Sequence, residues 1–292
     1  MNQFIGTGVA LITPFNADLS IDFEGLSKLV NHNNENGTEY LVISGTTGES
    51  ATITFEEKQD IVKHIAKVNN KRVPLVLGIG GNNTSAVISE IEATDLSEID
   101  ALLSVSPYYS KPTQEGIYQH FKAVSEASPL PIILYNVPGR TSSNMLPETT
   151  LRLARDFENV IAVKEAGNKM SQYFQLIKDK PEGFHIISGD DDLALPVALG
   201  GGSGVISVIG QAFPKLFSQM IRDGIAGKAK ESFDAHYKLM EVTSLIFSEN
   251  NPAGIKAVLD SLNITKPHVR LPLVEASDAL KAKIKNEAQK IG

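Results

Sequence analysis

Lys164 is the residue of this chain whose surroundings most favour chemistry. It ends the apolar run at residues 160–163, and a run of this kind predicts a strand that carries the lysine into a buried position. Burial disfavours the ammonium ion and lowers the pKa of the lysine, so the neutral amine becomes available as a nucleophile. The alternative is a structural lysine that reaches solvent along its aliphatic stem or pairs with Glu165.

Other polar side chains follow neighbouring apolar runs and could act beside this lysine. The phenol of Tyr135 could move protons next to a carbonyl adduct. The hydroxyl and backbone N–H groups of Thr46 and Thr47 could bind a carboxylate, and Arg140 could hold a substrate carboxylate in a bidentate pair. Each of these residues also has a structural interpretation: a packed tyrosine, a turn between glycines, and an exposed salt bridge.

Short apolar runs recur along the chain and must position these residues. Each run is too short for a helix, is rich in Val, Ile and Leu, and lacks the alternation of a half-exposed strand. This pattern predicts strands that are buried on both faces, as in a parallel sheet. The eight runs lie at residues 8–13, 40–43, 74–79, 101–105, 131–135, 160–164, 184–188 and 204–208.

Amphipathic segments between the runs predict helices, one of which begins with a capping box at Thr54 and Glu57. Eight successive strand–helix units predict an α/β fold, a closed (β/α)8 TIM barrel, whose active site lies at the carboxyl ends of the strands. An open doubly wound sheet is the alternative, but it usually has fewer strands. The predicted helices lie at residues 23–37, 54–68, 113–127, 146–156, 171–179 and 213–225.

The barrel pattern ends near residue 224, and no strand-like run follows it. We therefore expect two domains, a catalytic barrel at residues 1–224 and a helical C-terminal domain at residues 225–292. The second domain is expected to contain three helices, at residues 228–247, 252–262 and 273–291.

The composition of the 292 residues excludes several classes of function. The formal net charge is −7 and no stretch concentrates the basic residues, which disfavours nucleic-acid binding. The chain has no cysteine, and its six histidines lack metal-ligand spacing, so we predict no metal site. No basic region opens the chain as in a secretory signal, and no apolar run approaches the roughly 18 residues of a membrane span. We expect a cytoplasmic protein that binds no membrane.

Three further motifs point less clearly to a function. Residues 78–83 resemble a dinucleotide-binding loop, but Asn83 stands where the third glycine belongs. The glycine-rich residues 200–204 follow a helix and precede a strand, which favours a helix C-cap over a phosphate cradle. The aspartates at 190–192 could bind a cation, and an acidic first turn of the next helix explains them equally well.

Several segments together closely resemble the dihydrodipicolinate synthase family, class I aldolase-type enzymes of the N-acetylneuraminate lyase superfamily. The resemblance covers essentially the whole chain, and its motifs are specific in combination. The matching segments are residues 45–50 (Gly-Thr-Thr-Gly-Glu-Ser), 107–109 (Pro-Tyr-Tyr), 135–141 (Tyr-Asn-Val-Pro-Gly-Arg-Thr) and 163–166 (Val-Lys-Glu-Ala), with 188–191 and 204–208 in support.

The resemblance implies that the chain condenses pyruvate with L-aspartate 4-semialdehyde in lysine and diaminopimelate biosynthesis. Lys164 would form a Schiff base with pyruvate, so no cofactor would be needed. The family's other site residues are carried over to the matching positions of this chain: a proton relay of Thr47, Tyr109 and Tyr135, substrate binding by Thr46, Thr47 and Arg140, and a pocket lined by the backbone of Gly189 and Ile206.

The same resemblance has implications for the assembly. In the family, the tyrosine that matches Tyr109 reaches into the site of the neighbouring subunit. The active unit is therefore expected to be a homodimer, commonly paired into a homotetramer.

A cleft that binds inhibitory L-lysine in some family members is altered in this chain. Ser50, Ala51, Asn82 and Tyr108 match residues of that cleft. Lysine-inhibited members carry a histidine at the position of Lys58 and a glutamate at the position of Ala86. Because the glutamate is absent and Lys58 adds a like charge, we expect weak or no inhibition by L-lysine.

Two other functions stay open from the residues alone. The first is another pyruvate-dependent lyase of the superfamily, which would cleave a 2-keto-3-deoxy sugar acid. Arg140 and the paired threonines argue against it, since sialic acid lyases generally lack an arginine at this position. The second is a non-catalytic barrel that binds a keto acid, in which Lys164 and the relay residues would have no use.

Overall fold

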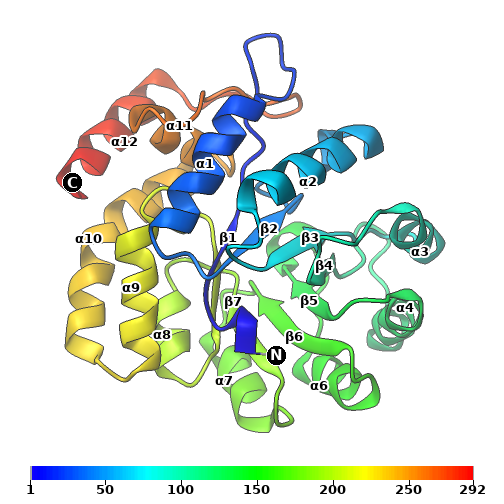
Figure 1. The fold of residues 1–292 in the computed structure, drawn as a ribbon. Coiled ribbons are helices and arrows are strands. Elements are labelled where there is room, and N and C mark those ends of the chain that lie inside the picture. Colours follow the sequence, from blue (N-terminus) through cyan, green and yellow to red (C-terminus); the bar gives the residue numbers. More distant parts are fainter. Residues whose placement is uncertain (1, 292) are drawn as a thin grey trace.

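Eight short parallel strands form a closed barrel in the computed structural model, which describes residues 2–291 (Figure 1). Each strand pairs with the next along the chain, and the last pairs with the first. Nearly every strand residue is buried, which confirms the predicted (β/α)8 barrel and the two-faced burial of its strands. The strands are β1 (Gly6–Ala10), β2 (Tyr40–Ile43), β3 (Leu75–Gly78), β4 (Ala101–Val105), β5 (Ile132–Asn136), β6 (Val160–Glu165), β7 (His185–Ser188) and β8 (Gly204–Ser207).

Helices surround the barrel and follow each strand, as the βα rhythm predicts (Figure 1). The predicted capping box at the start of α2 is present: the Thr54 side chain accepts from the Glu57 N–H and the Glu57 carboxylate accepts from the Thr54 N–H. The barrel helices are α1 (Phe23–Glu35), α2 (Phe55–Asn69), α3 (Thr84–Ala93), α4 (Gln114–Ala127), α5 (Pro138–Thr141), α6 (Pro147–Asp156), α7 (Met170–Asp179), α8 (Ala194–Leu199) and α9 (Pro214–Ile225), with 3-10 turns η1 (Asn2–Phe4), η2 (Ser50–Thr52) and η3 (Ile209–Gln211).

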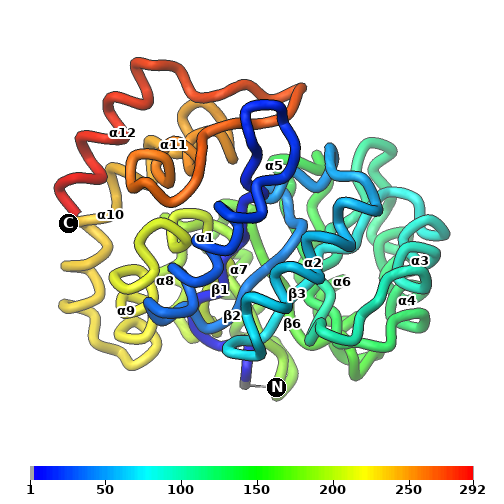
Figure 2. Tube along the Cα trace, turned by 45° about the horizontal axis from the view of Figure 1, so that its top comes forward, coloured from blue at the N-terminus to red at the C-terminus, as the bar shows by residue number. Residues whose placement is uncertain are grey.

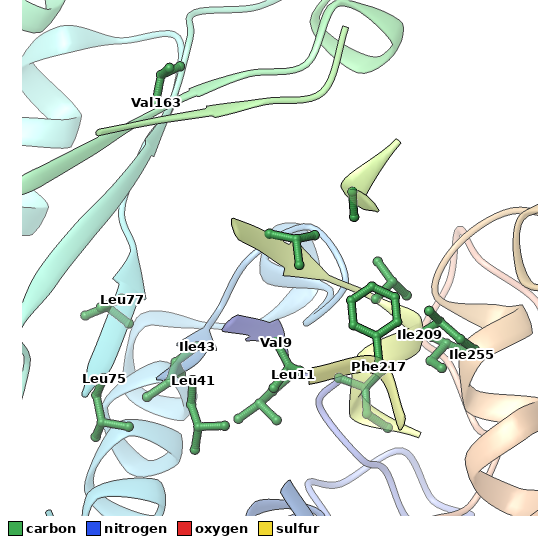
Figure 3. Close-up of a cluster of buried hydrophobic side chains, with 14 of the residues drawn as sticks. Val9, Leu11, Leu41, Ile43, Leu75, Leu77, Val163, Ile209, Phe217 and Ile255 are labelled. Carbon is green, nitrogen blue, oxygen red and sulfur yellow. The ribbon is translucent and has the colours of Figure 1, made fainter. Parts of the chain in front are cut away.

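Side chains fill the barrel on the inside and pack against the helices on the outside. Tyr40 fills the interior, and its ring lies so close to Gly8 that a Cβ there would meet it at 2.1 Å. The outer layer joins strands to helices, including α9 and the C-terminal α11 (Ala253–Ser261). Figure 3 labels part of this outer layer: Val9, Leu11, Leu41, Ile43, Leu75, Leu77, Val163, Ile209, Phe217 and Ile255.

The C-terminal segment is helical, as expected, and packs directly on the barrel. It contains α10 (Ala229–Ser248), α11 and α12 (Asp278–Ile291). In Figures 1 and 2 the orange and red part of the chain lies beside α1 and the loop that precedes it. Helix α10 also packs against α8 and α9. The expected division at residue 224 stays a prediction, and the helix at that point continues to Ile225.

The structure corrects several predicted boundaries. Strand β1 begins two residues before the expected start at residue 8 and ends at Ala10 rather than residue 13. The last helix starts at Asp278, not at residue 273, because Ser277 is its cap: its hydroxyl accepts from the N–H of Leu280. Helix α3 was not predicted, since only Val87 and Ile91 face the core and form a stripe too narrow to recognise.

The three weaker motifs have structural roles in this fold. Asn83 is the N-cap of α3 and accepts from the N–H of Ala86. Gly200 is the C-cap of α8, as expected. Asp191 does not extend that helix; its buried carboxylate instead accepts from the Ser207 hydroxyl and from the N–H groups of Val208 and Ile209.

Candidate active site

Lys164 lies inside the barrel at the carboxyl end of β6. Ala162, two residues earlier on the same face, packs with the side chains that fill the barrel interior. Val163, between the two, packs outward against the helices. The lysine is 6% exposed, and its Nζ lies 4.5 Å from the centre of the Tyr135 ring. A cation over the face of a tyrosine is an attractive arrangement. The structure therefore brings together the two residues that the sequence singled out for nucleophilic attack and proton transfer.

A bulge in β6 decides this pairing. Ile132 of β5 lies opposite Val160, but the next residue, Ile133, lies opposite Ala162, so Ile161 is the extra residue. Beyond the bulge, Tyr135 and Lys164 are register partners. Since one residue of register exchanges the two faces of a strand, the bulge places the lysine on the interior face beside the tyrosine.

Gly189 leaves the space that the lysine side chain occupies. A Cβ at this position would lie 2.7 Å from Cβ of Ala166 and 3.0 Å from Cε of Lys164. The Gly189 N–H also donates to the carbonyl of Glu165 at 2.6 Å, which joins the ends of β6 and β7. Ile206 of β8 lies opposite Gly8 of β1 and is fully buried inside the barrel. The structure thus places both residues around the barrel interior.

Two aspartates, the half-buried Asp190 and the buried Asp191, follow β7 and interact with the charge of Lys164. Burial raises the pKa of Asp190 to about 6, and the ammonium of Lys164 opposes this rise. Burial also raises the pKa of Asp191. The hydrogen bonds that its carboxylate accepts from Ser207, Val208 and Ile209 oppose this rise, as does the charge of Lys164. Both aspartates therefore interact electrostatically with Lys164.

Glu165 holds together the loops beside the lysine. Its carboxylate accepts from Nδ2 of Asn136 at 2.9 Å and from Nε2 of Gln172 at 2.9 Å. Asn136 also donates to Oδ1 of Asn144, and the N–H of Met145 donates back to Asn136. This network supports the turn that carries Arg140, because Asn144 and Met145 lie three and four residues after the end of α5. Neither Glu165 nor Gln172 was among the site residues expected from the sequence.

The environment of Glu165 disfavours its charge. Burial raises its pKa to about 7, although the hydrogen bonds from Asn136 and Gln172 oppose the rise. A carboxyl group that titrates near neutral pH one residue from the candidate nucleophile is typical of functional sites. Its neighbour Tyr173 donates to the Glu165 carbonyl and lies 3.2 Å from Asp190 Oδ2, so the two acidic groups belong to one network.

Thr46 and Thr47 lie in the loop after β2, as predicted, but they differ in surroundings. Thr46 lines a cavity of about 870 Å³ at the carboxyl end of the barrel. Thr47 is buried, and its hydroxyl accepts a hydrogen bond from Nδ2 of Asn251 at 2.9 Å. Asn251 lies in the C-terminal segment and lines the same cavity. The sequence carried no signal for this contact, which joins residues 204 positions apart.

A buried ion pair anchors the same loop to the C-terminal segment. Nζ of Lys256 donates to Glu49 with both side chains inaccessible to solvent, and the Arg270 N–H donates to the other carboxylate oxygen. Burial lowers the pKa of Lys256 to about 8 against the opposing effect of Glu49. Glu49 itself has a left-handed backbone with φ of 56°. Helix α11 therefore forms part of the wall that holds the paired threonines.

Arg140 and the two adjacent tyrosines stand at the mouth of the site. Arg140 is exposed and lines the cavity, and its guanidinium makes no hydrogen bond with any residue from 2 to 291, so the group is available to an anionic ligand. Tyr108 lines the cavity as well. Tyr109 has φ of 71° and is 88% exposed, and the structure does not bring it against Tyr135 or Thr47.

The cavity continues into the cleft that the sequence predicted to be altered. Ser50, Ala51 and Lys58 line it together with Glu90. Lys58 is buried, donates to the Gly78 carbonyl at 2.6 Å and forms an ion pair with Glu90. Burial lowers the pKa of this lysine, and Glu90 opposes the shift. The sequence interpretation missed Glu90, which lies one helical turn beyond the exposed Ala86 on α3.

Asn82, the remaining cleft residue, donates to the Tyr108 carbonyl at 3.3 Å and so joins the loops after β3 and β4.

Across residues 2–291, no three His, Asp or Glu side chains come together as metal ligands. In the same stretch, no helix combines the length and apolar character of a membrane span.

Known proteins share this chain's sequence and fold. The model of the dihydrodipicolinate synthetase family matches residues 3–291. The 4-hydroxy-tetrahydrodipicolinate synthase of Flavobacterium psychrophilum is 56% identical over 280 residues, 96% of each chain. The pyruvate complex of the chloride-inhibited dihydrodipicolinate synthase of Acinetobacter baumannii has a TM-score of 0.95 at 36% identity, covering 98% of both chains. A monomeric dihydrodipicolinate synthase variant has a TM-score of 0.96 at 35% identity, covering 99% of this chain and 97% of its own.

Proposed function

This chain belongs to the dihydrodipicolinate synthetase family, and we propose that it condenses pyruvate with L-aspartate 4-semialdehyde through a Schiff base on Lys164. The product is 4-hydroxy-tetrahydrodipicolinate, so the protein is a lyase of the class I aldolase type in lysine and diaminopimelate biosynthesis. The observation that carries the proposal is the position of Lys164, buried inside the barrel with its Nζ over the ring of Tyr135.

The chemistry needs only side chains of this protein and the two substrates. The Lys164 amine attacks the keto carbon of pyruvate, water leaves, and an iminium ion forms. Loss of a methyl proton gives the enamine, whose carbon attacks the aldehyde of the second substrate. The amine of that substrate then displaces Lys164 from the former keto carbon, which closes the ring and regenerates the lysine. No cofactor takes part in this sequence.

Each site residue has a proposed role in these steps. Thr47, Tyr109 and Tyr135 move protons, and Thr46 binds the carboxylate of pyruvate. Arg140 binds the carboxylate of the semialdehyde, a role supported by its free guanidinium at the cavity mouth. The backbone of Gly189 and Ile206 lines the pocket beside the lysine, which is supported by the packing of Gly189 against the lysine side chain.

We also propose that the enzyme acts in the cytoplasm as a homodimer, paired into a homotetramer. The support is Tyr109, whose left-handed backbone holds an aromatic ring almost wholly in solvent beside the cavity-lining Tyr108. A large exposed aromatic group held in this way is suited to burial in a partner subunit.

Borohydride trapping with pyruvate tests the proposal. Reduction should leave one pyruvate-derived group per chain, mapped to Lys164 by peptide mass, with the buried Lys58 and Lys256 as internal controls that stay unmodified. Lys164→Ala should lose both turnover and the adduct. Full activity of that variant would refute the Schiff-base mechanism, and the absence of an adduct on the folded parent protein would favour a non-catalytic keto-acid-binding barrel instead.

A further inference from the structure

Asn251 connects the C-terminal segment to the candidate proton relay. It lies between α10 and α11, is 5% exposed and lines the cavity. Its Nδ2 donates to the hydroxyl of Thr47 at 2.9 Å. Its Oδ1 has no partner among residues 2–291, although it is buried. The amide nitrogen of Asn251 is therefore bonded to Thr47, and the amide oxygen remains unpaired within residues 2–291.

The direction of this hydrogen bond determines what the Thr47 proton can do. A threonine hydroxyl has one proton to donate and two lone pairs that accept. Because the amide nitrogen of Asn251 occupies a lone pair, the hydroxyl proton of Thr47 is not used in this contact. Thr47 donates to no residue in the described chain, so its proton remains available for transfer.

The backbone beneath Asn251 is fixed by close packing. Its N–H donates to Oδ1 of Asn250 at 2.8 Å. Three residues later, Gly254 approaches α10 so closely that a Cβ would lie 2.2 Å from the carbonyl oxygen of Ile246. The buried pair of Lys256 and Glu49 holds the same part of α11 against the threonine loop. Asn251 therefore presents its amide to Thr47 from a rigid support.

We propose that Asn251 is a positioning residue for proton transfer: by donating to Thr47, it directs the threonine's own proton into the relay. This inference rests on the proposed function, since it concerns the step that converts the pyruvate iminium ion to the enamine. It also makes the C-terminal segment part of the active site, although Lys164 and the other relay residues all belong to the barrel.

Deuterium exchange at the methyl group of pyruvate measures this step without the second substrate. The parent enzyme in D2O should exchange the methyl protons, which proton NMR follows directly. For Asn251→Ala we expect exchange to slow about five- to tenfold, the factor that corresponds to the loss of one neutral hydrogen bond. Borohydride trapping of the same variant should stay within about twofold of the parent, because Schiff-base formation precedes the step.

The near-isosteric Asn251→Asp tests the direction of the hydrogen bond. A carboxylate only accepts, so Thr47 would donate to it and its proton would be withdrawn from the relay. We expect exchange to slow on the order of 10²-fold, more than in Asn251→Ala. The exposed Asn286→Asp on α12 makes the same chemical change in the same segment and should exchange at the parent rate. Circular dichroism of all variants checks that each is folded.

A double-mutant cycle separates positioning from a general structural effect. If Asn251 acts through Thr47, then Asn251→Ala should slow exchange no further in a Thr47→Val background. Additive losses, or parent-rate exchange in Asn251→Asp, would overturn the proposal while the Schiff-base function stands. Failure of the parent to form the adduct would instead refute the proposed function.

Discussion

Glu165 links the stability of the protein to pH, because its folded pKa of about 7 lies above the ordinary value of 4.5. Between these two pH values the folded state holds a proton that the unfolded state has released, so raising the pH lowers the free energy of unfolding. Glu165→Gln keeps the shape of the side chain and removes its titration. We expect the stability of this variant relative to the parent to increase as the pH rises from about 4.5 to about 7.

Urea unfolding of both proteins across this range measures the difference. His120 also titrates abnormally in this window, but its contribution is common to both proteins and cancels. The charge of Asp190 acts directly on Glu165, so the titration of Asp190 contributes to the measured difference as well. A difference in unfolding free energy that does not change with pH would contradict the role assigned to Glu165.

Tyr135 allows catalysis to be separated from folding at a single atom. Its phenol oxygen makes no hydrogen bond with any residue from 2 to 291, so Tyr135→Phe breaks no contact of the free enzyme apart from solvation. We expect turnover to fall roughly 10²-fold or more while the melting temperature stays within a few degrees of the parent. Steady-state kinetics measures the loss of turnover, and thermal unfolding measures the melting temperature. Unchanged turnover would show that Tyr135 has no part in the proton relay.

At the scale of elements, the pairing of α2 with α3 bears on regulation. Lys58 of α2 and Glu90 of α3 form an ion pair within the cleft, so the carboxylate one helical turn from position 86 is already engaged. We therefore predict that L-lysine inhibits this enzyme weakly or not at all. An inhibition curve with pyruvate and the semialdehyde near their KM values measures the sensitivity to L-lysine. Full inhibition at sub-millimolar L-lysine would contradict the prediction.

The loops after β5, β6 and β7 form a single polar unit. Glu165 receives donors from Asn136 and Gln172, while its carbonyl accepts from Gly189. Strand β6 is thus connected to its neighbours on both sides, and these contacts fix the turn with Arg140 relative to Lys164. This arrangement explains how Lys164, whose Nζ makes no hydrogen bond with any residue from 2 to 291, is kept in one place by the packing of its neighbours.

At the scale of the whole molecule, subunit complementation tests the proposed dimer. If each site uses its own Lys164 and the partner's Tyr109, a mixed dimer of Lys164→Ala and Tyr109→Phe subunits has one site with both residues intact. Each variant alone should be nearly inactive, and mixing after dissociation should restore activity toward half that of the parent per dimer. No restoration in a confirmed mixed dimer would mean that Tyr109 acts within its own subunit or not at all.

Much of the architecture was predictable because its signals are local. Buried parallel strands appear in the sequence as short apolar runs, and their carboxyl ends meet at one face of the barrel. The sequence therefore predicted a single site for the residues that follow these runs: Lys164, Tyr135, Thr46 and Arg140. Helix α3 and the start of α12 were missed or misplaced, because a narrow apolar stripe and a serine cap are weak signals.

The sequence by itself determined the fold class, the family and the candidate nucleophile, since these depend on residue patterns within a few positions. Only the tertiary structure decided which residues meet. The bulge at Ile161 sets the register that places Lys164 over Tyr135, and strand register depends on the neighbouring strand rather than on local propensity. The contact between Asn251 and Thr47 arises only when the C-terminal segment packs on the closed barrel, so no pattern within either segment reveals it.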